Sequence, residues 1–412
     1  KFINSNSFEL TGKGSRNITL LKLYVKRIFR FKFYERIKFK NEKIILNPSN
    51  WQTVLITGWY GTETAGDKAI LGEIIHRLRN YNKKIKIYVT TIDSRLSWCT
   101  RDEMDLDIEY IPINQSTTFI AKNKICSLIF GGGPLMDSSK LSIISKIFQL
   151  AHKKKIYKLL YGCGVGPIFS DNNKFFISNI IKLSDFSFYR DKESFDYALS
   201  LGGREKNSKV CCDPAILYVE RFRKQNKINK KDIKKIPLLI RESTAEYKNN
   251  LSNDDFLNSL KDIVKLQKFT FTAMHSFWRG NDDRFLFYKI LNNPNFKFSE
   301  HPFFHYKSLN EILKEINCAK FVVAMRYHSH IFALGLNTPF LSIDYTGEKG
   351  KVSNLLKRIN YQHSIKFSNF SKSEFIKSYN YLEKNSNILS SKIKQKSQSI
   401  SKSLINYYES YW

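Results

Sequence analysis

The feature that most constrains this chain is a repeated alternation of short apolar segments with longer segments of helical pattern. Short runs rich in apolar residues, typical of buried strands, lie at residues 54–57, 85–89, 126–130, 157–161 and 186–190. Segments with the length and spacing of helices lie among them at 67–81, 139–153 and 175–183. Apolar strands that alternate with helices indicate a parallel sheet covered on both faces.

The same alternation begins again after a lysine-rich stretch, residues 221–235, which we interpret as a linker. Further strands are predicted at 237–241, 269–273, 321–324 and 339–343, and helices at 253–266, 308–317 and 327–336. The sequence therefore predicts an α/β protein with four parts: an N-terminal segment 1–50, a first domain 51–225, a second domain 236–370 and a helical tail 371–412.

The chain has 412 residues, enough for two domains, and a formal net charge of +31. A charge of this size attracts polyanions and anionic membrane surfaces. Residues 18–40 interleave basic with aliphatic and aromatic side chains, a composition that suits the face of an anionic bilayer. The alternative is a helix that packs on the first domain.

The composition also bears on the compartment. No apolar run approaches the roughly 18 residues of a membrane-spanning helix, and the first residues lack the order of a signal peptide. The six cysteines show no C-x-x-C spacing, so we expect reduced thiols rather than disulfides or a metal site. We expect a cytoplasmic protein, peripheral at the inner face of the membrane if residues 18–40 bind lipid.

Three glycine-rich turns follow strands of the first domain, where open α/β sheets bind ligands. Neither a G-x-G-x-x-G nor a P-loop pattern is present, which disfavours a dinucleotide or Walker site. The turns are expected to form a shared crevice, and simple turns are the alternative. Their candidate ligand-facing residues are Gly58, Tyr60, Gly61, Asp67, Gly131, Gly132, Gly133, Asp137, Gly164 and Gly166.

The chemistry is expected at Arg326-Tyr327-His328, where a predicted strand leads into a helix. Arginine suits a bidentate grip on phosphate or carboxylate, and histidine exchanges a proton near neutral pH. Arg241 ends another strand, and Lys349 and Lys351 follow a third, so these cations could surround one small polyanion. In the alternative interpretation, His328 and His330 cap or pack.

The sequence does not decide the roles of two other segments. Arg190 and Asp191 could pair with each other as an ordinary ion pair. Asp282 and Asp283 follow a predicted strand and fit either a hydroxyl-binding site or a solvated loop.

Taken together, these motifs resemble the polysaccharide pyruvyl transferase family. The resemblance covers about residues 53 to 365 and rests on the order and spacing of six elements, which are residues 58–71, 131–137, 162–167, 190–194, 213–215 and 326–334. It implies a fold similar to the GT-B glycosyltransferases, in which two Rossmann-like domains face a cleft and a C-terminal helix returns to the first domain.

The resemblance also implies an activity. Phosphoenolpyruvate would be the donor and a sugar hydroxyl pair the acceptor, giving a pyruvate ketal on a surface polysaccharide or its lipid-linked precursor. Arg241 and Arg326, with Lys349 or Lys351, would bind the donor, His328 would be the catalytic acid/base, and the glycine turns would form the acceptor side. No metal, cofactor or nucleic acid is expected.

Two other functions remain open on the sequence alone. A GT-B glycosyltransferase would use a nucleotide-sugar in the same cleft, because fold does not fix function. A non-catalytic polyanion-binding protein would account for the charge but leaves the ordered glycine turns unexplained.

We predict that the first 45 residues contribute to membrane binding. Deleting residues 1–45 should reduce co-sedimentation with anionic vesicles, since it removes the whole basic, apolar segment at residues 18–40. Neutral vesicles serve as the control. Unchanged sedimentation of the shortened chain with anionic vesicles would remove this interpretation.

Overall fold

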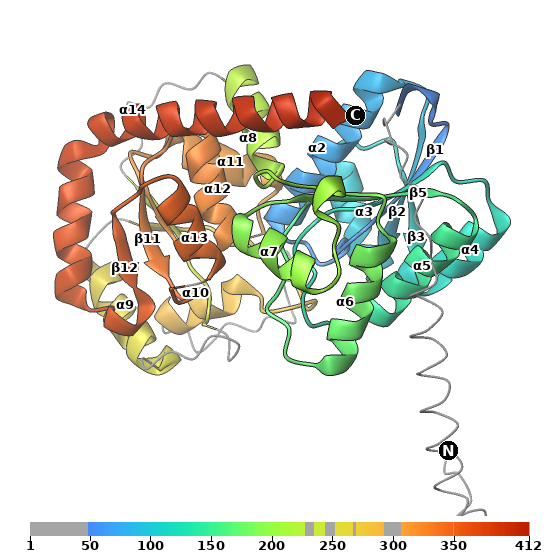
Figure 1. Ribbon diagram of the computed structural model, residues 1–412. Helices are drawn as coiled ribbons and strands as arrows, with labels where there is room; N and C mark the ends of the chain where they lie inside the picture. The colour runs from blue at the N-terminus through green and yellow to red at the C-terminus, as the bar shows by residue number, and fades with distance from the viewer. Residues whose placement is uncertain are drawn as a thin grey trace, which may run out of the picture. The chain divides into compact units, whose positions relative to one another are not determined.

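Two all-parallel β-sheets, each flanked by helices, organise the protein in the computed structural model (Figure 1). The structure describes residues 48–226, 235–243, 252–266, 269–291, 306–348 and 350–411, all within one unit that spans residues 46–412. The predicted N-terminal segment 1–50 lies almost entirely outside the described residues, as does Lys349.

The N-terminal lobe, residues 53–225, holds a seven-stranded sheet in the order β3-β2-β1-β4-β5-β6-β7. Every pair of neighbouring strands is parallel. The strands are β1 Thr53–Thr57, β2 Lys86–Thr91, β3 Glu109–Pro112, β4 Ser127–Phe130, β5 Tyr157–Cys163, β6 Phe186–Tyr189 and β7 Ser208–Val210. The helices are α2 Ala65–Tyr81, α3 Ser94–Glu103, α4 Ser116–Lys122, α5 Leu141–Lys153, α6 Asp171–Leu183, α7 Lys192–Ser200 and α8 Ala215–Gln225.

The C-terminal lobe, residues 235–366, holds a five-stranded sheet in the order β12-β11-β10-β8-β9. Its strand pairs are also parallel. The strands are β8 Ile236–Leu239, β9 Phe269–Phe271, β10 Val322–Ala324, β11 Phe340–Asp344 and β12 Ser364–Lys366. The helices are α9 Asn253–Leu266, α10 Asp283–Leu291, α11 Leu309–Cys318, α12 Tyr327–Gly335 and α13 Lys351–Arg358.

The central strands are apolar because helices cover both of their faces. Every residue of β4 and β10 is buried, and so is every residue of β11. A strand buried on both sides cannot alternate polar with apolar residues, which explains the continuous apolar runs of the sequence. The predicted parallel α/β fold is confirmed in both lobes.

Several elements were not predicted. Helix α8 continues to Gln225, into the stretch interpreted as a linker, because Phe222 is buried and Arg221 pairs with Glu73 at 2.7 Å. The edge strands β3, β7 and β12 have only three or four residues each, so they give little sequence signal.

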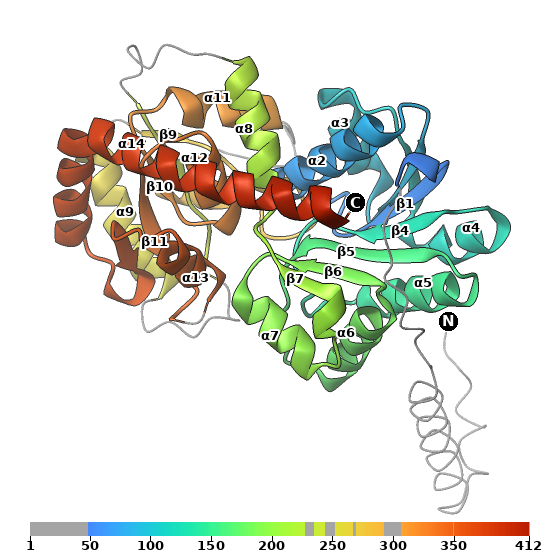
Figure 2. The same ribbon diagram turned by 45° about the horizontal axis from the view of Figure 1, so that its top comes forward.

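Helix α14, Lys372–Tyr411, runs from the C-terminal lobe across to the N-terminal lobe (Figure 2). Ser390 donates a hydrogen bond to the Asn337 carbonyl in the C-terminal lobe, at 2.7 Å. Near the other end, Tyr408 is fully buried and stacks on Tyr161 of β5, with ring centroids 4.6 Å apart. The predicted return of a C-terminal helix to the first domain is therefore confirmed.

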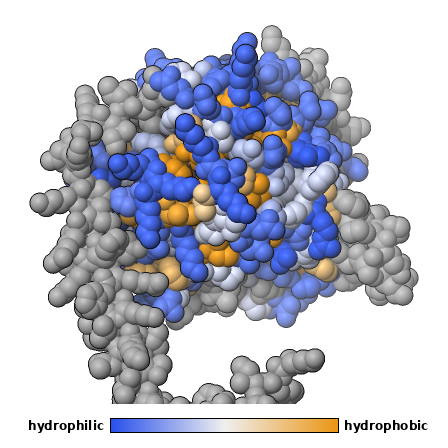
Figure 3. All heavy atoms as spheres, turned by 90° about the vertical axis from the view of Figure 1, so that its right-hand side faces the viewer, coloured by the Kyte–Doolittle hydropathy of each residue, from blue (hydrophilic) through white to orange (hydrophobic). Residues whose placement is uncertain are grey.

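Two further observations concern the surface. Figure 3 shows one side of the molecule, on which hydrophobic areas are interrupted by hydrophilic side chains. Among the described residues, no helix combines the length and hydropathy that crossing a membrane requires.

We predict that Tyr408→Ala lowers the free energy of unfolding by about 3–5 kcal/mol, because it removes a buried aromatic ring from the junction of α14 with β5. Its neighbour Tyr407 is 37% exposed, so Tyr407→Ala should cost less than about 1 kcal/mol. Denaturant unfolding of both variants measures the difference. Equal costs would contradict the anchoring role of Tyr408.

Candidate active site at the two switch points

The candidate site lies where strand order reverses in each sheet. In the N-terminal lobe the chain leaves β1 in one direction and returns to β4 on its other side, and β8 and β10 are related in the same way in the C-terminal lobe. Loops after such strands diverge and leave a crevice for ligands. Asp67 lies in the first turn of α2, which follows the loop after β1, and Gly133 lies in the loop after β4. The loops after β8 and β10 carry Arg241 and Arg326.

The loops after β1 and β4 pack closely on each other. A Cβ atom on Gly58 would lie 1.8 Å from the carbonyl oxygen of Gly131, so this approach requires glycine. Tyr60 is buried, and a Cβ on Gly132 would lie 2.9 Å from its ring. Gly61 has a φ of +80° and lies against the end of β2. These glycines allow the loops to approach each other, and the ring of Tyr60 fills the space beside them.

Asp67 is a buried acidic residue beside these loops. It lies in the first turn of α2, and its Oδ1 would be 3.3 Å from a Cβ on Gly133. Burial raises the pKa of Asp67 to about 6, with a smaller opposing effect of His328. A buried carboxyl with a raised pKa is typical of acid–base catalysis.

Contacts within the protein hold the end of the second predicted turn and the third predicted turn in place. Asp137 accepts hydrogen bonds from the backbone amides of Phe169 and Ser170, at 2.6 and 3.2 Å, and so holds the loop before α6. Gly166, in the third predicted turn at residues 162–167, has a φ of +92°. A Cβ on Gly164 would lie 2.5 Å from the guanidinium of Arg190, so this glycine makes room for a buried arginine.

Arg190 joins this turn to the C-terminal lobe. Its guanidinium carbon lies 4.4 Å from the centre of the Tyr327 ring, and its Nε is 3.2 Å from an oxygen of Asp191. The side chain is 4% exposed. The pairing of Arg190 with Asp191 that the sequence left open is therefore present, and it joins a buried arginine to a partly buried aspartate.

His328 lies between the lobes. A Cβ on Gly66 would lie 1.9 Å from Nδ1 of His328, so the imidazole rests directly on the α2 backbone. Its Nε2 is 3.3 Å from Oδ2 of Asp213, within ion-pair distance but without hydrogen-bond alignment. The other oxygen of Asp213 accepts a hydrogen bond from the amide of Ala215. The carboxylate is thus fixed at the start of α8 and faces the imidazole.

Arg326 is held by a buried carboxylate. Its Nε is 2.7 Å from Oδ2 of Asp283 and its Nη2 is 2.6 Å from Oδ1, while Nη2 also donates to the Asn281 carbonyl at 3.0 Å. Asp283 is 2% exposed and accepts from the amides of Met274 and His275. Nη1 is the remaining donor group of Arg326. Asp283 is therefore neither a solvated-loop residue nor a hydroxyl ligand, since it is committed to Arg326.

Three cations surround the phenol of Tyr345, which follows β11. Nη1 of Arg241 donates to the Tyr345 hydroxyl at 3.4 Å. Burial raises the pKa of a tyrosine, yet the pKa of Tyr345 lies below its ordinary value because of three neighbouring positive charges, in decreasing order of effect those of Lys351, Arg241 and Arg326. The structure thus brings together Arg241, Arg326 and Lys351, all of which the sequence indicated as donor ligands.

Lys351 connects this cationic group with the acid–base group. It is the first residue of α13, and burial lowers the pKa of its amine, an effect that Tyr345 opposes. Its charge also lowers the pKa of Asp67 in the opposite lobe. The charge of Lys351 therefore acts on a residue of each lobe, Asp67 and Tyr345.

The two lobes also touch beside the site. The amide of Ala65 donates to the Met274 carbonyl at 2.9 Å, and Thr64 Oγ1 lies 2.6 Å from Nδ1 of His275. Burial lowers the pKa of His275 to about 3, so this histidine is neutral. His330 is fully buried, with its ring nitrogens near the Arg326 carbonyl and the Ser342 hydroxyl, and it packs within the C-terminal lobe.

Sequence reasoning did not name Asp213 and Tyr345 as site residues, and it left Asp283 open between a hydroxyl-binding site and a solvated loop. Each of the three has a readable local signal. Asp213 precedes Pro214 at the start of a helix, Asp283 opens α10, and Tyr345 comes directly after β11. Among the described residues, no group of three or more His, Cys, Asp or Glu side chains is arranged to hold a metal ion.

The fold is shared with several solved enzymes. A UDP-GlcNAc 2-epimerase from Neisseria meningitidis, bound to UDP-GlcNAc, superposes with a TM-score of 0.54 at 14% identity, covering 86% of this chain and 100% of the other. A putative UDP-N-acetylglucosamine 2-epimerase from Listeria monocytogenes gives 0.56 at 11% identity, covering 83% and 90%. These similarities establish the GT-B-like architecture. No curated protein matches the chain in sequence.

The family assignment rests on sequence. The model of the polysaccharide pyruvyl transferase family matches residues 65–347, a range that begins at α2 and ends after β11. This range contains Asp67, Asp213, Asp283, His328 and Tyr345, and so includes most of the site. The chain belongs to the polysaccharide pyruvyl transferase family and is a transferase.

Proposed function

We propose that this transferase moves a pyruvyl group from phosphoenolpyruvate to two hydroxyls of a sugar, forms a cyclic ketal and releases phosphate. The observation that carries the proposal is the meeting of two groups of side chains. Arg241, Arg326 and Lys351 gather around Tyr345, and His328 and Asp67 lie across the same site. The first group suits a small dianion, and the second suits proton transfer.

The cationic group matches the donor's charges. Phosphoenolpyruvate carries a carboxylate and a phosphate, and arginine can bind either through parallel hydrogen bonds. Asp283 already engages Nε and Nη2 of Arg326, so Nη1 would reach the donor together with the other cations. Because the guanidinium is fixed before the donor binds, little reorganisation is needed as charge moves to the departing phosphate.

The proposed reaction begins with proton transfer. His328 protonates the methylene carbon of phosphoenolpyruvate, which leaves a cation-like centre at the adjacent carbon. A sugar hydroxyl attacks that carbon and gives its proton to Asp67. Asp213, fixed at the start of α8, stabilises the protonated imidazole.

The second half of the reaction closes the ketal. A second sugar hydroxyl attacks the same carbon while the bond from that carbon to the phosphate oxygen breaks, and the hydroxyl proton leaves with the phosphate. Two carbon–oxygen bonds and one carbon–hydrogen bond form, and one carbon–oxygen bond and the enol double bond are lost. The proton on Asp67 restores His328 for the next cycle.

We propose that the acceptor belongs to a bacterial-type surface polysaccharide, such as a capsule or exopolysaccharide, or to its lipid-linked precursor. The net charge of +31 supports this, because anionic lipid carriers and membrane surfaces attract cations. The enzyme would then work in the cytoplasm, at the inner face of the membrane.

The activity is tested by incubation with phosphoenolpyruvate and a panel of synthetic and lipid-linked glycans. We expect phosphate release together with the mass increment of a pyruvate ketal. In a parallel arm, a UDP-sugar replaces phosphoenolpyruvate, since the fold is also that of UDP-sugar enzymes. A hexose increment or UDP release in that arm, with no ketal in the first, would favour a glycosyltransferase and contradict the proposal.

His328→Gln and Arg326→Ala should each lower turnover at least ~100-fold, because they remove the proton donor and a phosphate ligand. His152→Gln, on α5, is the matched control and should retain activity. Near-normal turnover in both site variants would place the chemistry elsewhere.

The pH dependence of kcat/KM should reflect the protonation of Asp67. Its carboxylate is the active form, so kcat/KM should fall as pH drops through about 6, where Asp67 takes up a proton. Asp213 raises the pKa of Asp67, so Asp213→Asn should move this acidic limb to lower pH. Asp196→Asn, at an exposed ion pair, should leave the limb in place. An unmoved limb in Asp213→Asn would exclude Asp67 as its source.

A further inference from the structure

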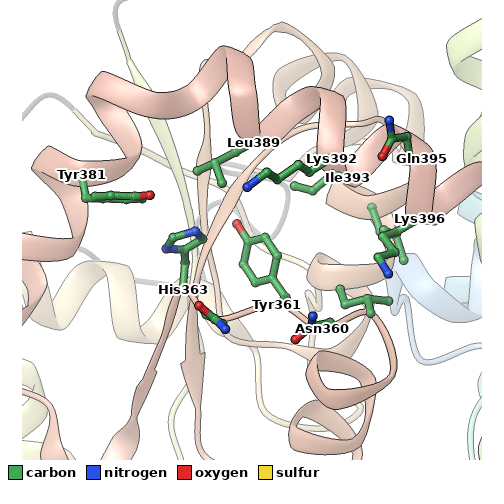
Figure 4. A pocket seen from close by; sticks show the side chains of 12 residues that line it. Asn360, Tyr361, His363, Tyr381, Leu389, Lys392, Ile393, Gln395 and Lys396 are labelled. Carbon is green, nitrogen blue, oxygen red and sulfur yellow. The ribbon is translucent and has the colours of Figure 1, made fainter.

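A second cavity lies in the C-terminal lobe, beneath α14 and apart from the site between the lobes. Its volume is about 320 Å³, within the range of small-molecule sites. One wall is the segment from Ile359 to His363, between α13 and β12, and the other is α14 from Tyr381 to Lys396 (Figure 4). None of its lining residues belongs to the catalytic arrangement.

The ionisable side chains that line this cavity and carry a charge are basic. Lys392 and Lys396 lie one helical turn apart on α14, and His363 lies on the opposite wall. No aspartate or glutamate lines the cavity, and in the part of the chain that the structure describes neither lysine has a carboxylate within 4.0 Å. In Figure 4 the Lys392 amine extends toward the space above His363 and Tyr361.

The charge of Lys392 affects the pKa of His363. Burial lowers the pKa of His363, and Lys392 lowers it further. Like charges that share a cavity repel each other, and a bound anion would relieve that repulsion.

Aromatic rings give the cavity a rigid surface. The His363 and Tyr381 rings stack with centroids 4.9 Å apart, and Tyr381 remains 48% exposed. Tyr361 stacks on Phe340 at 4.1 Å, and its hydroxyl donates to the Phe340 carbonyl and accepts from the amide of the same residue. The Tyr361 ring is thus fixed, while the exposed ring of Tyr381 can receive another ring.

The amides of Gln362 and Gln395 complete the lining and can serve as donors or acceptors. Lysine ammonium groups, amides and an exposed ring together suit an organic anion that carries a ring. A carboxylate-bearing sugar and a nucleoside monophosphate both have this chemistry.

We propose that the cavity under α14 is a binding site for a small ring-bearing anion, held by Lys392 and Lys396 and stacked on Tyr381. The site is independent of pyruvyl transfer. Because α14 reaches both lobes, an occupant would lie against the element that ties them together.

The test is isothermal titration of the full chain with glucuronic acid, uridine monophosphate and inorganic phosphate in turn. We expect at least one ring-bearing anion to bind more tightly than inorganic phosphate. In the double variant Lys392→Gln/Lys396→Gln, affinity for that anion should fall at least ~10-fold, because charge-assisted hydrogen bonds are lost. Tyr381→Ala should lower the affinity for the ring-bearing anion but not the affinity for phosphate.

Lys394→Gln is the matched control, since Lys394 lies on α14 between the two lysines, is exposed and does not line the cavity. It should bind as the unaltered protein does. Binding at the site between the lobes would be insensitive to all of these changes, so the variants separate the two sites. No binding of either ring-bearing anion, or equal affinity in the double variant and in Lys394→Gln, would overturn the proposal.

Discussion

The close approach of His328 to the backbone of Gly66 is the contact on which the site depends. Any side chain at Gly66 would occupy the space of the imidazole, which lies within about 2 Å of where a Cβ would be. This approach brings the first turn of α12 onto the first turn of α2. It therefore places the crevice of one sheet opposite the crevice of the other, and Asp67 opposite the cations of the C-terminal lobe.

The pairing of Arg326 with Asp283 sets the electrostatics of the cationic half. A buried arginine without a carboxylate would be costly, and a carboxylate that neutralised the whole cluster would weaken anion binding. Asp283 engages one edge of one guanidinium. In the surrounding group, Lys351 and Arg241 face a phenol rather than a carboxylate. The arrangement therefore keeps a positive field in the crevice while holding Arg326 in place.

The sequence could predict the fold and much of the site for one reason. Strands of a doubly wound sheet end at a common edge, so residues that follow strands gather without any knowledge of side-chain packing. Arg241, Arg326 and Lys351 were found in this way, and the structure brings them together around Tyr345.

What sequence reasoning could not predict depends on packing across long separations. Tyr60 looks exposed in a glycine-rich loop, yet it fills the space that the small residues of the β4 loop leave open. The sequence leaves Asp283 open between a hydroxyl-binding site and a solvated loop, because only the folded structure brings it to Arg326, 43 residues further along the chain. Helix α8 continues through a basic stretch because Arg221 meets Glu73 of α2.

Proton transfer and lobe arrangement are linked through Asp67. Its raised pKa comes first from burial, and the groups that modify it include His328 and Lys351 from the C-terminal lobe. If the lobes move apart to admit a glycan, water reaches Asp67 and its pKa returns toward that of an ordinary aspartate. A carboxylate with so low a pKa is a weaker base. In the proposed mechanism, Asp67 would therefore be the stronger base when both lobes enclose it, which favours proton transfer in the closed arrangement.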